Sequence, residues 1–201
     1  MRTIDPARGE QILESAARLF HKRHYHEVRM DDVAADAGVA KGTLYRYFQD
    51  KEALYLALIL SSMNRFVADI APMMADDEPA DERLRAYIRR SIAFCERFPY
   101  FIDLVQRVEG TSSPERLAPL QEGRQRILRI VADVLTELGR CDGYHVPDPL
   151  LAAIALTGML RQILRFYPKP WPDALPDLIA EQFLHGVCPL KARAAKASRL
   201  N

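Results

Sequence analysis

The chain has 201 residues, 49% of them hydrophobic and 27% charged, so it can bury a sizeable core in one large or two modest domains. A formal net charge of +1 excludes a protein that coats nucleic acid through bulk positive charge. The chain lacks a run of about 18 apolar residues and a signal pattern, so we expect a cytoplasmic protein.

The first predicted helix occupies residues 6–24. Asp5 supplies a cap, Pro6 suits the first helical position, and Ile12 and Phe20 belong to an apolar face at helical spacing. The histidines at the end of this helix lack a carboxylate or cysteine at metal-ligand spacing, and the three cysteines of the chain are far apart. We therefore expect no metal site and no cofactor.

Two short helices joined by a tight turn follow the first helix. Residues 30–37 form the first of them, and Gly38 follows where the chain needs a residue that accepts positive φ. The second begins near Lys41 and directs Leu44 and Phe48, one turn apart, into the core. This pattern predicts a helix-turn-helix, which places one helix in the major groove of DNA.

The free face of the second helix carries side chains that suit nucleic acid. Arg46 can donate two hydrogen bonds to a guanine edge, and Thr43 can bond a base or contact a thymine methyl group. Gly42 has no side chain to hold the helix away from DNA, and neighbouring lysines and tyrosines can reach phosphates. The predicted DNA-binding residues are Lys41, Gly42, Thr43, Tyr45, Arg46, Tyr47 and Lys51.

The run from Asp32 to Phe48, followed by Asp50-Lys51-Glu52-Ala53-Leu54, resembles the DNA-binding domain of the TetR (tetracycline-repressor) family. The resemblance implies a DNA-binding domain over residues 1–52 and a helical effector-binding and dimerisation domain over residues 53–201. Arg29 departs from the family pattern, in which a threonine or serine commonly caps the first helix of the motif. His24 departs too, because members often have a glycine there.

Helix signals continue to the end of the chain, and no segment alternates with period two for long enough to predict a strand. The sequence therefore predicts an all-α protein of about nine helices, which matches the layout of the TetR family. After the helix-turn-helix, the predicted helices occupy about residues 50–71, 81–97, 99–108, 113–139, 148–167 and 176–185.

The helix at 148–167 is apolar around much of its circumference, which indicates burial on several sides. One side could contact a second subunit, because one recognition helix rarely binds DNA specifically on its own. We expect a homodimer through residues 148–167 and 176–187, with Phe183, Leu184 and Val187 completing the surface. The alternative is that this helix forms the core of a monomer.

A small-molecule effector pocket is predicted in the helical body, because large adaptable side chains recur there beside a few polar groups. Aromatic residues at helical spacing are also typical of an ordinary core, so this alternative stays open. The predicted ligand-binding residues are Phe66, Tyr87, Phe94, Phe98, Phe101, Arg107, Met159, Gln162 and Phe166.

These features favour a bacterial DNA-binding transcription regulator, a ligand-responsive repressor that binds a palindromic operator as a dimer. Two other classes stay open: a helical adaptor that binds protein through a degenerate motif, and an enzyme that uses the carboxy-terminal helical body. The sequence has no nucleophile with a placed base and no phosphate-binding glycine loop, so we expect no catalytic residues.

Overall fold

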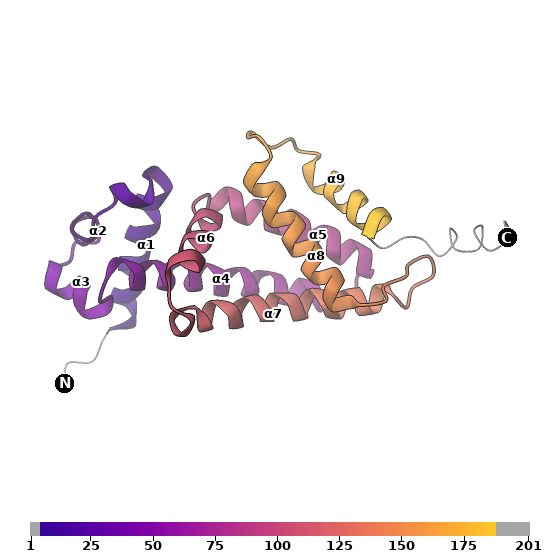
Figure 1. The fold of residues 1–201 in the computed structure, drawn as a ribbon, viewed down its shortest axis with the longest axis horizontal. Helices are drawn as coiled ribbons and strands as arrows, with labels where there is room; N and C mark the ends of the chain where they lie inside the picture. The colour runs from indigo at the N-terminus through magenta and orange to yellow at the C-terminus, as the bar shows by residue number, and fades with distance from the viewer. Residues whose placement is uncertain (1–4, 188–201) are drawn as a thin grey trace. The chain divides into compact units, whose positions relative to one another are not determined.

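The computed structural model describes residues 5–187 (Figure 1). These residues form nine α-helices, one 3₁₀ turn at Tyr25–Glu27 and a π-helical turn at Phe183–Val187, and they contain no strand, which confirms the all-α prediction. The helices are α1 Pro6–Lys22, α2 Met30–Asp36, α3 Lys41–Tyr47, α4 Lys51–Met74, α5 Ala80–Arg97, α6 Phe101–Thr111, α7 Pro114–Leu138, α8 Pro149–Phe166 and α9 Leu175–Gln182.

The described chain divides into two compact units. The first contains the chain up to Arg65 together with Arg97–Gly123, and the second contains Phe66–Glu96 and the chain from Arg124 onward. Helices α4 and α7 contribute residues to both units, so neither unit is a single continuous stretch of sequence.

The core of the helix-turn-helix region is formed by α1, α2 and α3, which lie together in Figure 1. Ile12 and Ala16 of α1, Val33 of α2 and Leu44 of α3 are almost completely buried. The Asp5 side chain accepts a hydrogen bond of 3.0 Å from the Ala7 N–H, as the predicted cap requires. The apolar face of α1 thus supports the two short helices.

Helix α4 extends beyond its predicted end near residue 71. It passes through Pro72, which has no backbone N–H to donate, and ends at Met74. The Ala75 N–H donates to the Ala71 carbonyl at 3.1 Å, and buried Arg83 donates to the Met74 carbonyl at 2.7 Å. Arg83 also pairs with Glu137, so one guanidinium joins three helices of the second unit.

Helices α8 and α9 each bury one face in the second unit. Leu156 and Leu160 of α8 and Ile179 of α9 are buried, and Arg85 of α5 binds Glu181 of α9 at 2.6 Å. By length and hydropathy alone, α4 and α8 would also suffice to cross a membrane. Core helices of soluble proteins can have the same length and hydropathy. These two quantities therefore do not distinguish a buried core helix from a membrane-spanning helix.

Candidate nucleic-acid interface

The turn between α2 and α3 has the geometry that the sequence predicts. Gly38 has a φ of +62°, a conformation that residues with a side chain rarely adopt. The Gly38 N–H donates to the Ala35 carbonyl at 3.1 Å, and the Val39 N–H donates to the Ala34 carbonyl at 2.9 Å. These two bonds form a Schellman motif, which ends α2 and starts the chain toward α3.

The start of α2 has no side-chain hydrogen bond from the capping position Arg29, and its first turn is acidic. The Asp32 carboxylate accepts a hydrogen bond of 3.1 Å from the Arg29 N–H, and Asp31 lies in the same first turn. Negative charge at a helix amino terminus is stabilised by the helix dipole. The departure at Arg29 therefore leaves α2 without a side-chain cap, while the Asp32 bond and the acidic first turn support its start.

Most of the predicted DNA-binding side chains of α3 are exposed. Lys41, Gly42 and Arg46 are open to solvent, and Tyr45 has 41% of its surface exposed. Leu44, on the opposite face, is completely buried. A Cβ atom added to Gly42 would contact nothing within 4 Å, so packing does not require a glycine at this position.

Two of the α3 side chains have partners within the protein. Lys41 lies 2.8 Å from a carboxylate oxygen of Asp31, which raises the pKa of Lys41. The half-buried Tyr47 hydroxyl donates to the Asp5 carbonyl at 3.0 Å and accepts from the Asp5 N–H at 3.1 Å. These contacts hold α3 against α2 and the start of α1, and the exposed Arg46 lies 5.8 Å from the Tyr47 ring.

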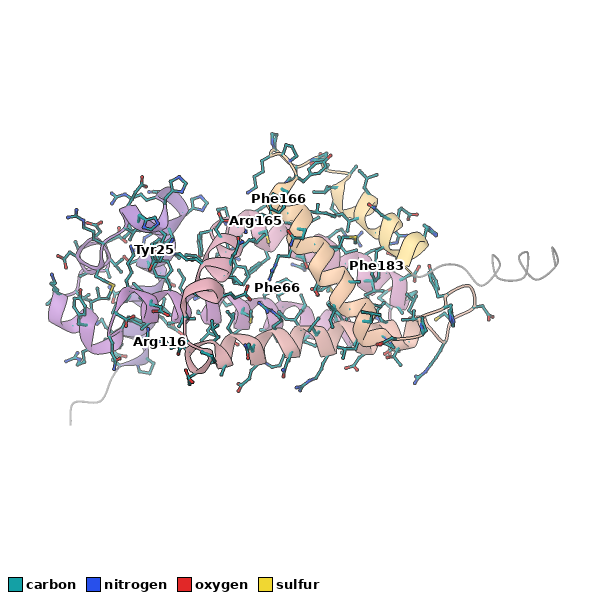
Figure 2. The ribbon with its side chains drawn as sticks, in the orientation of Figure 1. Tyr25, Phe66, Arg116, Arg165, Phe166 and Phe183 are labelled. Atoms are coloured by element: carbon teal, nitrogen blue, oxygen red, sulfur yellow. The ribbon has the colours of Figure 1, made fainter. Side chains whose placement is uncertain are left out.

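The half-buried Lys51 has partners within the first unit. Its Nζ donates to the Tyr25 carbonyl at 2.6 Å and lies 4.1 Å from the centre of the Tyr25 ring, which Figure 2 labels. Arg107 lies over the same ring at 3.9 Å and 3.1 Å from His26 Nε2. Burial, and then the charge of Arg107, lower the pKa of Lys51. In the absence of DNA, Lys51 therefore binds within the protein, and its contact with phosphate stays a prediction.

The sequence analysis missed a polar contact between α1 and α2. The fully buried Ser15 hydroxyl lies 2.7 Å from Asp36 Oδ2 and 3.2 Å from the Val33 carbonyl, and Arg18 binds the same Asp36 oxygen at 2.7 Å. The hydrogen bond from Ser15 and the nearby Arg18 guanidinium lower the pKa of Asp36. Ser15 lies on the apolar face of α1, which is the one local signal that could have identified it.

A second missed contact fixes the start of α4. Arg116 of α7, labelled in Figure 2, lies 3.1 Å from both Asp50 and Glu52. Asp50 also accepts a hydrogen bond of 2.7 Å from the Ala53 N–H, and this bond, followed by Arg116, lowers the pKa of Asp50. The helix that follows the recognition helix therefore begins at a capped and charge-paired residue.

The predicted ligand-binding residues are only partly brought together. In the second unit, the Phe66 ring lies 4.9 Å from Phe94 and 6.2 Å from Tyr87. Phe166 is 72% exposed, so the expectation that it lines the interior is wrong, and Gln162 is exposed as well. Met159 is half-buried in this unit.

The other predicted ligand residues belong to the first unit. Phe98 lies 6.1 Å from Tyr100, and Phe101 is half-buried near the start of α6. Arg107 lies over the Tyr25 ring and 3.1 Å from His26 Nε2, and its contact with a ligand stays a prediction. Sequence spacing could not reveal this, because the contacts join residues about 80 positions apart.

The predicted dimer residues fall into two groups. Leu150, Leu151 and Ile154 of α8 are each about half exposed or more, as is Leu178 of α9. Phe183 and Leu184 are buried inside the second unit, so the expectation that they complete the dimer surface is wrong. The side chain of Val187 lies outside the described part of the structure.

Comparisons with known proteins agree with this geometry. Residues 12–58 match the family described as bacterial regulatory proteins of the tetR family, and residues 77–187 match the tetracyclin repressor-like C-terminal domain. The second match alone spans more than half of the chain. The chain belongs to the TetR family. It is a DNA-binding transcription regulator of the helix-turn-helix type.

Three similar proteins illustrate this TetR-family membership. An uncharacterized HTH-type transcriptional regulator of Mycobacterium tuberculosis is 30% identical over 190 residues, which cover 94% of this chain and 90% of that protein. The HTH-type transcriptional activator FasR of Mycolicibacterium smegmatis is 26% identical over 81% of this chain and 73% of its own length. The regulator FadR from Bacillus subtilis, solved in complex with stearoyl-CoA, shares the fold with a TM-score of 0.74. It is 23% identical, and the match covers 88% of this chain and 98% of that chain.

The family and these relatives are transcription regulators rather than enzymes. Among the residues that the structure describes, no group of histidine, cysteine and carboxylate side chains has the arrangement of a metal site.

Proposed function

We propose that this TetR-family regulator binds an operator with two related half-sites, using the exposed face of α3 in each of two subunits. The observation that carries the proposal is the solvent-exposed set Gly42, Tyr45 and Arg46 on a helix whose opposite face is anchored by buried Leu44. Arg46 would contact a guanine edge, and Lys41 would contact phosphate. The predicted contact of Lys51 with phosphate is not part of this proposal.

The DNA contact is tested by a mobility shift on the DNA upstream of the chain's own coding region. Arg46→Ala should weaken specific binding by roughly 1 to 3 kcal/mol and reduce discrimination at one base pair of each half-site. Arg140→Ala, which removes an exposed arginine from the second unit, is the matched control and should leave the affinity unchanged. Equal affinities for Arg46→Ala and wild type would eliminate Arg46 from the interface.

We further propose that the dimer forms through α8 and α9. The exposed side chains Leu150, Leu151 and Ile154 form an apolar face on α8, and Leu178 adds an exposed leucine on α9. Apolar surface of this kind favours association with a self-complementary partner. A Cβ atom at Gly158 would contact nothing within 4 Å, which leaves room for a close approach by a second helix.

The proposed effector is a coenzyme A thioester of a fatty acid. Two arguments support this class: a structurally similar regulator was solved with stearoyl-CoA, and the second unit holds an aromatic cluster of Phe66, Tyr87 and Phe94. Large apolar side chains such as these are suited to contact an acyl chain. The effector would favour a dimer whose recognition helices are spaced wrongly for the operator, and would thereby release the DNA.

Titration of palmitoyl-CoA into the protein–operator complex tests this effector class. A coupling of roughly 1 to 3 kcal/mol should weaken operator binding by about 5- to 150-fold. Tighter DNA binding on addition of the thioester would contradict the proposed release of the operator by the effector. No change in DNA affinity while the protein still binds the thioester would contradict the mechanism.

The proposal also keeps the division into a DNA-binding domain at residues 1–52 and an effector and dimerisation domain at 53–201. We place the protein in the bacterial cytoplasm, since its relatives are bacterial transcription regulators that act on DNA.

A further inference from the structure

A cleft of about 260 Å³ lies within the first compact unit, among residues of α1, α4 and the segment 97–100. Leu13, Ala17, Leu58 and Phe98 form its apolar walls. Pockets that hold a complete drug-sized ligand have roughly 300 to 1,000 Å³. The cleft is therefore large enough for one end of a ligand, and the chemistry of its polar side chains indicates which end.

Three arginines line this cleft, against one carboxylate, Glu14. Arg18 is paired with Asp36 at 2.7 Å. Arg65 and Arg97 are exposed, and neither has a carboxylate partner among the residues that the structure describes. The guanidinium of Arg97 lies 5.4 Å from the centre of the Phe98 ring, and both residues line the cleft. The cleft thus carries uncompensated positive charge.

The hydroxyl of Tyr100 is the second observation that points to a ligand. Tyr100 lines the cleft and is 9% exposed, and its oxygen lies beside Ser62 without a hydrogen bond of normal geometry. Burial raises the pKa of Tyr100, while Ser62 and the Arg65 guanidinium lower it. The phenol therefore stays protonated at neutral pH and can donate one hydrogen bond. A buried hydroxyl without a partner costs stability unless a ligand supplies the acceptor.

We propose that this cleft binds the anionic group of the effector, a phosphate or a carboxylate, through Arg65, Arg97 and the Tyr100 hydroxyl. Guanidinium groups bind both anions through paired N–H bonds, and Tyr100 would add a third donor. The apolar walls then accommodate the part of the ligand next to the anionic group. This inference rests on the proposed effector class and assigns residues that recognise its charged end.

Arg18 connects this cleft with the helix-turn-helix. This side chain lines the cleft and also binds Asp36 of α2, so an anion in the cleft competes with Asp36 for its guanidinium. Occupation of the cleft would weaken one of the bonds that hold α2 against α1. Ligand binding would thereby change the support of the recognition helix from within the first unit.

Calorimetric titration of the full chain with three probes tests the site: palmitoyl-CoA, coenzyme A and palmitate. Arg65→Gln and Arg97→Gln should each weaken binding of the relevant probe by about ten-fold or more. Arg140→Gln, an exposed arginine of the second unit, is the control and should bind as wild type does. Losses confined to the two coenzyme A probes identify phosphate as the bound group, and losses confined to palmitate identify carboxylate.

Tyr100→Phe separates a ligand contact from a structural role. Because the hydroxyl has no partner in the free protein, this variant should have an equal or higher Tm without ligand, yet bind the probe several-fold more weakly. A lower Tm with unchanged binding would show a structural role only, and would remove Tyr100 from the proposed site.

The outcomes distinguish this site from the effector class itself. Wild-type affinity in Arg65→Gln, Arg97→Gln and Tyr100→Phe overturns the site but leaves the proposed effector intact. Failure of the wild-type protein to bind any of the three probes overturns both the site and the effector class, while the mobility shift still tests the DNA-binding function.

Discussion

Two glycines of the helix-turn-helix occupy their positions for different physical reasons. Gly38 has a φ of +62° in the turn, where a side chain is strained whatever space surrounds it. Gly42 is helical and exposed, and a Cβ atom there would meet nothing within 4 Å. The fold therefore accounts for Gly38 but does not require a glycine at position 42, where the proposed close approach to DNA would explain it.

This difference gives opposite expectations for alanine at the two positions. Gly38→Ala should lower the free energy of unfolding by about 1 to 2 kcal/mol, the cost of a left-handed residue with a side chain. Gly42→Ala should leave that free energy unchanged or raise it by up to about 1 kcal/mol through helix propensity, and should weaken operator binding. Urea denaturation and a DNA titration measure the two quantities. Unimpaired DNA binding by Gly42→Ala would contradict the proposed contact.

Asp36 predicts a pH dependence of stability. Its pKa is lowered by the hydrogen bond from Ser15 and then by Arg18, so its contribution is present above the unfolded value of 3.8 and is lost as pH falls through the folded pKa. Because Asp36 and Arg18 are partly exposed, Asp36→Asn should cost only about 0.5 to 1 kcal/mol at pH 7. The difference between the two proteins should shrink below about pH 4 in urea titrations. A constant difference down to pH 2 would exclude this role for Asp36.

At the scale of helices, local signals predict most of the fold. Asp5 caps α1 and Asp148 caps α8, and Gly38 ends α2, the first helix of the helix-turn-helix. Where a helix ends at a different residue than predicted, the difference is local, as at the end of α4, which continues through Pro72. These features depend on neighbours within a few residues, which a single sequence contains.

Contacts between helices could not be predicted in the same way. Lys51 binds the Tyr25 carbonyl 26 residues away, and Arg107 reaches Tyr25 from a different helix. In the sequence, both cations are candidates for contact with a ligand or a phosphate. A lysine or arginine that binds within the protein cannot be told from an exposed one by its residue type. Only the packing of α4 and α6 in the first unit shows that these two side chains bind an aromatic ring.

The placement of Lys51 predicts that it acts mainly through the position of α4. Lys51→Met should lower the free energy of unfolding by roughly 1 to 2 kcal/mol, because it removes a charged hydrogen bond to the Tyr25 carbonyl. Lys41→Met should change stability little, since its pair with Asp31 is exposed. Lys41→Met should instead reduce the salt dependence of DNA binding. A normal stability of Lys51→Met with a reduced salt dependence would restore Lys51 as a phosphate contact.

At the scale of the assembly, the exposed face of α8 is the feature that a single subunit does not explain. Leu156 and Leu160 bury the opposite face of this helix in the second unit, while Leu151 and Ile154 are 62% and 48% exposed. Because these apolar side chains lie on a well-packed helix, we expect a second copy of the chain to cover them.

Ile154→Glu tests the role of this face in assembly. The substitution places a charge on an exposed position, so the monomer should stay folded while the dimer is lost and operator affinity falls by at least ten-fold. Light scattering after size-exclusion chromatography gives the mass, and circular dichroism checks the helix content. Gln125→Glu, an exposed change on α7, should stay dimeric. A dimeric Ile154→Glu protein would require a different interface.

Operator binding by Arg46→Ala tests the central claim most directly. In a titration of labelled upstream DNA at fixed salt, wild-type protein should bind as a dimer with sequence discrimination, and Arg46→Ala should lose roughly 1 to 3 kcal/mol at one base pair of each half-site. Specific binding that is identical for wild type and Arg46→Ala, with the same preference at every base pair, would contradict the assignment of α3 as the recognition helix.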